Sequence, residues 1–195
     1  LFKQLGNKKL MFVVKANAYG HGLEEILSIT KDLSIIDYYA VDSVTEALMV
    51  KRADSKKKIL VLGWSDDDEL ETLLLNGFET VAPSPDFLKK VAKLARKLKV
   101  KAYVHLKIET GTGRMGMGPS AAADIFNVSP FPYRDIQVVG IYSHFANIED
   151  TTDHSYAQRQ LEIFNGLLTR INVKGLLRHF SCSASTLIFP ETYFD

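Results

Sequence analysis

Seven short apolar runs, separated by amphipathic stretches, place the tightest limit on the fold of this chain. The runs are rich in β-branched residues and nearly continuous in apolar character, which is typical of parallel strands buried on both faces. Apolar residues in the stretches between them recur with helical spacing. We predict strands at Met11–Ala16, Tyr38–Val41, Ile59–Leu62, Glu79–Ala82, Ala102–Ile108, Val138–Ser143 and Arg178–Cys182. We predict helices at Leu23–Leu33, Ser43–Arg52, Asp66–Asn76, Pro85–Leu98, Ser120–Phe126 and Tyr156–Arg170.

This alternation predicts a single α/β domain over residues 1–195, built as a (β/α)8 TIM barrel that is incomplete, with seven βα units present and the eighth strand missing. Polar residues follow nearly every predicted strand, whereas a doubly wound sheet would gather them at one switch point. They are Lys15, Ser43, Gly63, Ser84, Arg114, His144 and Ser183. We therefore expect the functional site at the mouth formed by the carboxyl ends of the strands.

The composition argues against several classes of protein. The chain has 24 basic and 23 acidic residues and a formal net charge of +1, so its charge gives no case for binding nucleic acid or a membrane surface. No apolar run approaches the roughly 20 residues of a membrane span. Cys182 is the only cysteine, which excludes an internal disulfide framework. We expect a globular protein of the reducing cytoplasm.

The segment VVKANAYGHG, residues 13–22, carries the strongest chemical signal. Lys15 leaves a buried strand, and partial desolvation of a lysine favours the neutral amine that attacks an aldehyde carbonyl. The glycines that follow let backbone N–H groups approach a phosphate, and the phenol of Tyr19 can donate to the same oxygens. These features predict a pyridoxal phosphate site with Lys15 as its Schiff-base lysine. The structural alternative is a surface lysine at the end of a strand.

The glycine-rich segment HLKIETGTGRMGMG, residues 105–118, follows the fifth predicted strand. The guanidinium of Arg114 suits a substrate carboxylate, such as that of an amino acid. The glycines also match the GxGxxG pattern of a dinucleotide site. That pattern normally follows the first strand of its fold, and no acidic residue ends the next strand to bind a ribose. A salt bridge between Arg114 and Glu109 is the structural alternative.

Two further candidates follow the sixth and seventh predicted strands. His144, in GIYSHFANIED, can contact a pyridine ring, hydrogen-bond a phosphate, act as a base or ligate a metal. The histidines show no HxH or HxxxH spacing, so we predict no metal site. Ser183, in SCSAST, is placed to contact a phosphate. The structural alternatives are a hydrogen-bonded residue at a strand end for His144, and a helix N-cap for Ser183 or Ser185.

Taken in order, these segments resemble the N-terminal barrel domain of the alanine racemase family. VVKANAYGHG resembles the cofactor-lysine signature of that family, and KIETGTGRMG resembles its KxDTGxGRxG motif. SHFANIED resembles the strand-six segment, and SCSASTLIFPE resembles the NSAATLRFPE-like segment. The resemblance covers essentially the whole chain. It implies a pyridoxal phosphate-dependent isomerase that interconverts L-alanine and D-alanine and supplies D-alanine for peptidoglycan.

The resemblance also implies a role for each candidate residue. Lys15 would bind the cofactor as an aldimine and act as the base for one substrate enantiomer. Tyr19 and Ser183 would contact the phosphate, and His144 would contact the ring. Arg114 would hydrogen-bond the cofactor's phenolic oxygen and the substrate carboxylate.

Other positions match or depart from the family pattern. Lys107 matches a lysine that is carbamylated in some family members and orients the arginine. Glu109 replaces an aspartate, and Cys182 replaces an asparagine and so removes an amide donor near the serine loop.

The chain stops at Asp195, whereas the family continues with an eighth strand, a phosphate-binding glycine loop and a β-domain that bears a tyrosine base. We therefore expect residues 1–195 to be a truncated N-terminal domain whose C-terminal β-domain is absent. Inverting a stereocentre needs a base on each face, so we expect this piece to be inactive by itself. The resemblance implies a homodimer for the full-length parent.

Other functions stay open on the sequence alone. A single-domain pyridoxal phosphate carrier or homeostasis protein also uses a barrel and a lysine, but it would need its own phosphate loop after the seventh strand. A related racemase or decarboxylase acting on serine, lysine or ornithine shares the same barrel. A fragment that binds no cofactor is the third possibility.

Overall fold

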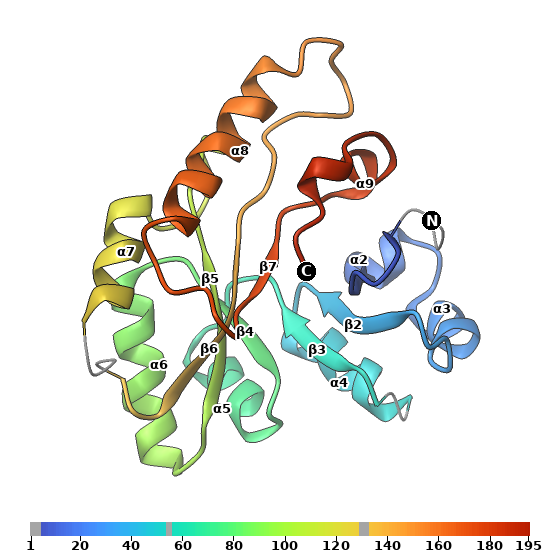
Figure 1. The fold of residues 1–195 in the computed structure, drawn as a ribbon. Helices are drawn as coiled ribbons and strands as arrows, with labels where there is room; N and C mark the ends of the chain where they lie inside the picture. The colour runs from blue at the N-terminus through green and yellow to red at the C-terminus, as the bar shows by residue number, and fades with distance from the viewer. Residues whose placement is uncertain (1–4, 54–55, 129–132) are drawn as a thin grey trace.

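The structure, a computed structural model, describes residues 5–53, 56–128 and 133–195 and contains one sheet in that part of the chain. Its seven strands follow one another in chain order, and every neighbouring pair is parallel. They are β1 (Leu10–Val13), β2 (Ile36–Val41), β3 (Lys58–Val61), β4 (Glu79–Ala82), β5 (Ala102–Lys107), β6 (Ile136–Tyr142) and β7 (Leu177–His179). The sheet curls into an incomplete barrel (Figure 1). The predicted fold class is thereby confirmed.

Helices connect the strands and pack against the outer face of the sheet. The crossover helices are α3 (Leu23–Thr30), α4 (Val44–Arg52), α5 (Asp67–Leu75), α6 (Pro85–Leu98), α7 (Pro119–Asn127) and α8 (Ser155–Leu168). Three short elements follow β1 and β7: α2 (Lys15–Tyr19), α9 (Ser183–Ile188) and the 3-10 helix η1 (Pro190–Thr192). Within the described residues, none of the helices has the length and apolar character needed to cross a membrane.

Two separate cores lie on the two faces of the sheet, because side chains alternate between the faces along each strand. The larger core fills the space between the sheet and the helices and includes Tyr39, Leu88 and Phe164. The smaller core lines the barrel interior and consists of Ala40, Leu60, Val81 and Tyr142, with Met11, Val13 and Leu62 packed against it. Polar side chains occupy the rest of this interior, and they reach the mouth.

The apolar runs predicted every strand, and the differences are confined to the ends. The bounds of β4 and α6 match the prediction. β1 ends at Val13 rather than Ala16, because the backbone becomes left-handed from Ala16 onward. β7 ends at His179 rather than Cys182, because Cys182 already caps α9. α3 and α8 end before Leu33 and Arg170, respectively.

Two of the predicted mouth residues serve helices instead of the site. The hydroxyl of Ser43 accepts a hydrogen bond from the backbone N–H of Glu46 at 3.2 Å and caps α4. The hydroxyl of Ser84 accepts one from the backbone N–H of Phe87 at 3.2 Å and caps α6. Their position after strands reflects the need of each helix for an N-cap, which is the ordinary role of serine there.

Candidate functional site

The chain enters the mouth through a left-handed turn directly after β1. Ala16, Asn17, Ala18 and Tyr19 all have φ between 52° and 55°. L-residues adopt this conformation at a cost of roughly 1–2 kcal/mol each. The side-chain oxygen of Asn17 accepts from the backbone N–H of Leu23 at 2.8 Å, and the backbone N–H of Asn17 donates to Glu46 at 3.1 Å. Such retained strain is typical of functional sites.

Lys15 is the first residue of this turn and is half-buried. The backbone of Val14 is still held by the sheet, since its N–H donates to Ala40 at 2.8 Å. The Lys15 side chain therefore starts from a rigid strand end rather than from a free loop. Tyr19 closes the same turn with its ring 60% exposed. Burial raises the pKa of its hydroxyl, which keeps that group protonated and able to donate.

Three neighbouring strands end in one row at the mouth. Lys107, Tyr142 and His179 are the last residues of β5, β6 and β7, and the strand register pairs Lys107 with Tyr142 and Tyr142 with His179. The ring of Tyr142 stacks on that of His179 with centroids 4.6 Å apart. The Lys107 ammonium lies 5.8 Å from the centroid of the Tyr142 ring. Burial raises the pKa of Tyr142 far above its usual value, so its hydroxyl stays neutral.

The glycine-rich turn after β5 wraps around the carboxylate of Glu109. The backbone N–H of Gly111 donates to this carboxylate at 2.5 Å. Burial opposes ionisation of Glu109, but the backbone amides of residues 111–114 outweigh it and lower the pKa. Arg114 is exposed and forms no ion pair with Glu109 in the part of the chain that the structure describes. The predicted salt-bridge alternative for Arg114 is therefore wrong. The N–H of Gly111 binds Oε1 of Glu109, and Oε2 is buried and has no hydrogen-bond partner within the described residues.

Residues on α8 that sequence reasoning missed hold the loops after β5 and β6 together. The buried side-chain amide of Gln160 donates to the carbonyl of His144 at 3.1 Å and accepts from the N–H of Ala146 at 2.9 Å. The hydroxyl of Tyr156 donates to the carbonyl of Gly111 at 2.8 Å. Gln160 could have been noticed in the sequence, because it is a polar residue on the apolar face of the predicted helix. These contacts fix the backbone on both sides of the site.

Four basic groups share the mouth and form what we call the cationic mouth: Lys15, Lys107, Arg114 and His144. Burial and the charges of Arg114 and Lys15 lower the pKa of Lys107, although Glu109 acts in the opposite direction. Burial and the charges of Arg114 and Lys107 lower the pKa of His144. None of the four side chains forms a hydrogen bond or ion pair with another described residue. The charge of Glu149 acts on His144 in the opposite direction, as that of Glu109 does on Lys107. Because no ion pair within the described residues balances the mutual repulsion, the cluster favours a bound anion.

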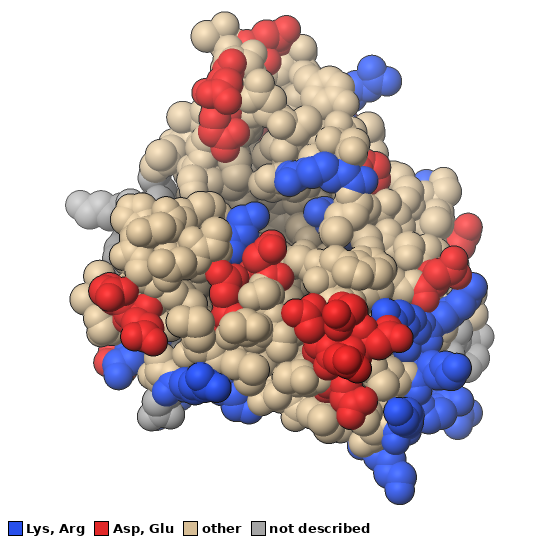
Figure 2. All heavy atoms as spheres, turned by 180° about the vertical axis from the view of Figure 1, so that it is seen from behind, with Lys and Arg blue, Asp and Glu red and all other residues tan. Residues whose placement is uncertain are grey.

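Figure 2 shows a hollow on one face of the molecule, with basic side chains at its border and acidic side chains close beside them. An anion with several oxygens can be held in such a place by charge and hydrogen bonds together.

Ser183 and Ser185, the two candidate serines in the segment after β7, have different roles in the structure. Cys182 is the N-cap of α9, and the hydroxyl of Ser185 accepts from its backbone N–H at 2.9 Å. The N-cap is therefore Cys182 and neither Ser183 nor Ser185, as the alternative for this segment had it, although Ser185 takes part in the capping box. Ser183 is exposed in the first turn of α9, and its hydroxyl has no partner in the described part of the chain. Its hydroxyl is available to a ligand.

The Glu109 turn gives a prediction on stability and pH. Because the folded Glu109 has a lowered pKa, its carboxylate stabilises the fold at pH above the pKa of the unfolded chain. This contribution disappears as the pH falls through the pKa of the folded state. Glu109→Gln is expected to lower the free energy of unfolding by on the order of 1 kcal/mol near neutral pH, since the group is partly exposed. Urea unfolding at neutral and acid pH measures the difference, which should vanish in acid.

Glu162→Gln is the matched control for this prediction, because Glu162 lies exposed on α8. We expect this variant to unfold like the original chain at both pH values. An equal loss of stability for both variants, or a loss at Glu109 that persists in acid, would contradict the role given to the carboxylate.

The fold defines an incomplete parallel β/α barrel whose mouth gathers basic side chains near a lysine that follows its first strand. The chain belongs to the family of the alanine racemase N-terminal domain, because the family profile "Alanine racemase, N-terminal domain" matches residues 1–195. This membership confirms the resemblance drawn from the four sequence segments.

Individual relatives agree with the family assignment. The chain is 36% identical over 194 residues to a protein named alanine racemase from Desulforamulus reducens, covering 97% of this chain and 51% of that protein. A solved alanine racemase from Clostridium difficile 630 superposes with a TM-score of 0.88 at 26% identity, covering 98% of this chain and 50% of that one. An alanine racemase from Bartonella henselae with covalently bound pyridoxal phosphate superposes with a TM-score of 0.84 at 22% identity. It covers 99% of this chain and 55% of that one, and at this identity it shows the fold alone. The chain thus spans about half the length of the relatives it matches.

Proposed function

We propose that this chain is the cofactor-binding domain of an alanine racemase, which interconverts L-alanine and D-alanine with pyridoxal phosphate and supplies D-alanine for peptidoglycan. The observation that carries the proposal is Lys15 at the strained turn after β1, near basic side chains that form no hydrogen bond or ion pair with another described residue. Family membership over residues 1–195 supports the choice of alanine. Because the chain spans about half of its relatives, the complete reaction is proposed for the whole protein.

The donor set of the mouth fits pyridoxal phosphate. The cofactor combines a phosphate with an aldehyde, and the mouth offers a lysine amine together with unpaired basic and hydroxyl groups. Lys15 would hold the aldehyde carbon, Tyr19 and Ser183 would donate to the phosphate, and His144 would contact the ring. When bound, pyridoxal phosphate withdraws electrons from the substrate and so acidifies its Cα proton. Arg114 forms no ion pair with an acidic side chain among the described residues, so its guanidinium would serve the substrate carboxylate and the cofactor's phenolic oxygen.

Lys15 would also move the proton at Cα from one face of the substrate, since its amine starts at the edge of the mouth on a rigid strand. Arg114 would fix the carboxylate and so orient the Cα–H bond toward this amine. One positioned base serves one face, and the base for the other face is not assigned to a residue of this chain.

Lys107 is proposed to be carbamylated. Its lowered pKa, caused by burial and by the charge of Arg114, favours the neutral amine. That amine would attack carbon dioxide, form a carbamate N–C bond and release one proton. The resulting anion would turn the repulsion between Lys107 and Arg114 into an ion pair that orients the guanidinium. The homodimer of the full-length protein stays a prediction of the family resemblance, and the cytoplasmic location stays a prediction of the cysteine content.

Covalent trapping of the cofactor tests the proposed function. The chain is mixed with pyridoxal phosphate, reduced with borohydride and digested, and the modified lysine is located by mass spectrometry. We expect one dominant adduct, on Lys15. Lys93→Ala, on the exposed face of α6, should leave the yield unchanged, whereas Lys15→Ala should abolish the adduct. Scattered labelling of surface lysines in place of Lys15 would overturn the proposal.

A further inference from the structure

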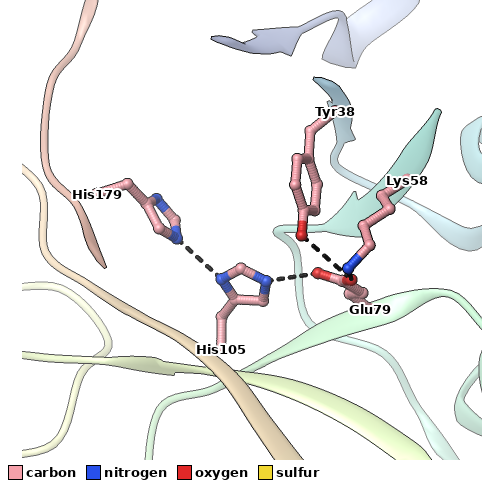
Figure 3. A network of polar contacts seen from close by, with 5 residues as sticks. All are labelled: Tyr38, Lys58, Glu79, His105 and His179. Carbon is pink, nitrogen blue, oxygen red and sulfur yellow. Dashed lines mark hydrogen bonds and ion pairs between the residues drawn. The ribbon is translucent and has the colours of Figure 1, made fainter. Parts of the chain in front are cut away.

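A chain of polar contacts crosses the interior of the barrel, outside the set of groups assigned above. Five strands contribute one residue each: Tyr38, Lys58, Glu79, His105 and His179 (Figure 3). The carboxylate of Glu79 lies 2.6 Å from Nε2 of His105, and Nδ1 of His105 lies 2.9 Å from Nε2 of His179. The second carboxylate oxygen of Glu79 meets the Lys58 ammonium at 3.1 Å and the hydroxyl of Tyr38 at 3.4 Å. Lys58 is exposed at the amino end of β3, so the contacts lead from that end of the barrel to its mouth.

The barrel interior is shaped to hold His105. The strand register places His105 opposite Gly140 of β6, and a Cβ on Gly140 would lie 2.1 Å from Nδ1 of His105. His105 is completely buried and Glu79 is 4% exposed. Apolar branched residues usually fill this layer of a barrel, and burying charged groups there is costly unless they are paired. The sequence therefore retains a buried polar pair, and the space for it, in place of a simpler apolar core.

The first bond of the chain has a fixed direction. Burial opposes ionisation of Glu79, but its hydrogen bond to His105 and the charges of His105 and Lys58 outweigh burial and lower its pKa. An ionised carboxylate only accepts hydrogen bonds. Nε2 of His105 must therefore carry a proton.

The second bond follows from the first. When His105 is neutral, its Nδ1 is bare and Nε2–H of His179 must donate to it, which leaves Nδ1 of His179 as an acceptor. When His105 is protonated, its Nδ1–H donates to His179, and Nδ1 of His179 then bears the hydrogen. Burial and the charge of His105 lower the pKa of His179 well below its usual value, so His179 stays neutral in both cases.

The free end of this chain lies at the mouth. His179 is the last residue of β7, in register with Tyr142 and Lys107, and it stacks on Tyr142. The ring is partly exposed, and its Nδ1 has no hydrogen-bond partner within the described ranges. The hydrogen-bonding state of Nδ1 is therefore presented at the mouth, toward whatever group lies there.

We propose that Glu79 and His105 are positioning residues that fix the tautomer of His179 and so decide whether its Nδ1 accepts or donates a hydrogen bond at the mouth. The expected effect on cofactor binding rests on the proposed function, whereas the tautomer does not. The titratable groups that face the two histidines are Glu79 of β4, Tyr38 of β2, Lys58 of β3, Tyr142 of β6, Lys107 of β5 and Asp195 near the chain end.

Histidine tautomers can be read directly from two-bond 1H–15N correlation spectra of the 195-residue chain labelled with 15N-histidine and free of ligand. With neutral His105, we expect His179 as the Nε2–H tautomer and a coupling between Nδ1 of His105 and Nε2 of His179. Glu79→Gln replaces an obligate acceptor by an amide that accepts or donates, so the tautomers of both histidines should mix. Lys58→Met keeps the Glu79–His105 contact and should preserve the original pattern.

Each result of this experiment either supports or overturns the proposal. An unchanged His179 pattern in Glu79→Gln, or a wild-type His179 protonated at Nδ1 beside a neutral His105, would overturn the proposal. If Glu79→Gln does not fold, the wild-type spectrum decides alone, because averaged shifts at both nitrogens of His179 contradict a fixed tautomer.

Binding of pyridoxal phosphate supplies a second readout. Glu79→Gln should weaken it about tenfold or more, the scale known for partners that orient metal-binding histidines. Lys58→Met removes an exposed ammonium and keeps the hydrogen bond between the buried Glu79 carboxylate and His105, so it should change the binding by less than about fivefold. Equal effects of the two variants would contradict the proposal. Failure of Lys15 to form an adduct would remove the proposed function and leave the tautomer result standing.

Discussion

Replacing Gly140 by alanine is expected to lower the free energy of unfolding by roughly 3 kcal/mol or more. The added Cβ would lie 2.1 Å from Nδ1 and 2.5 Å from Cε1 of His105. The ring of His105 is held on its other side by Glu79 at 2.6 Å, so it has no free direction in which to move. The variant must either overpack the barrel or break a buried charged pair, and both are costly. Urea unfolding measures the loss as a fall in the midpoint at constant slope.

Gly166→Ala is the matched control, because Gly166 lies exposed in the interior of α8 and a Cβ there meets nothing within 4 Å. Alanine is the better helix former by up to about 1 kcal/mol, so this variant should be slightly more stable. Similar stabilities for Gly140→Ala and the unmodified chain would mean that His105 does not occupy the space opposite Gly140.

The fold was predictable because the information for it is local. Each strand is a continuous apolar run, and each crossover helix has a periodic apolar face, so the sequence contained the order and number of βα units. The left-handed turn of α2 was not predictable, since alanine and tyrosine disfavour φ near +52° and one asparagine does not indicate four consecutive residues in this conformation. Its conformation is imposed by long-range contacts, such as the one between Asn17 and Glu46.

In the candidate site, too, the residues that follow strands could be predicted, whereas contacts between residues far apart in the sequence could not. Lys15 and Arg114 could be found because a barrel brings the residues after its strands to one mouth. The position after a strand did not separate ligand-facing residues from helix caps, as Ser43 and Ser84 show. The Glu79–His105–His179 chain could not be found, because its members lie 26 and 74 residues apart and appear in the sequence as one strand carboxylate and two lone histidines. Only the strand register places them in contact.

The chain loaded with pyridoxal phosphate is expected to exchange the Cα proton of only one enantiomer of alanine with solvent deuterium. Lys15 approaches the substrate from one face, and removal of a proton from the opposite face requires a base placed there. Deuterium incorporation into L-alanine and D-alanine, each followed separately by mass spectrometry and chiral chromatography, gives the two rates. Replacing Lys15 by alanine should slow the favoured exchange by roughly 10²- to 10⁴-fold, the usual contribution of a positioned base.

Lys93→Ala controls for the loss of a lysine as such and should leave the favoured exchange unchanged, because Lys93 lies on the exposed face of α6. Free pyridoxal phosphate also exchanges Cα protons, but without regard to chirality, so the ratio of the two rates isolates the contribution of the protein. Equal exchange of both enantiomers, or formation of the opposite enantiomer by this chain alone, would place a second base among its own residues and refute the one-face assignment of Lys15. His144 would then be the first group to replace, since burial and the charges of Arg114 and Lys107 lower its pKa and so favour the neutral, basic form.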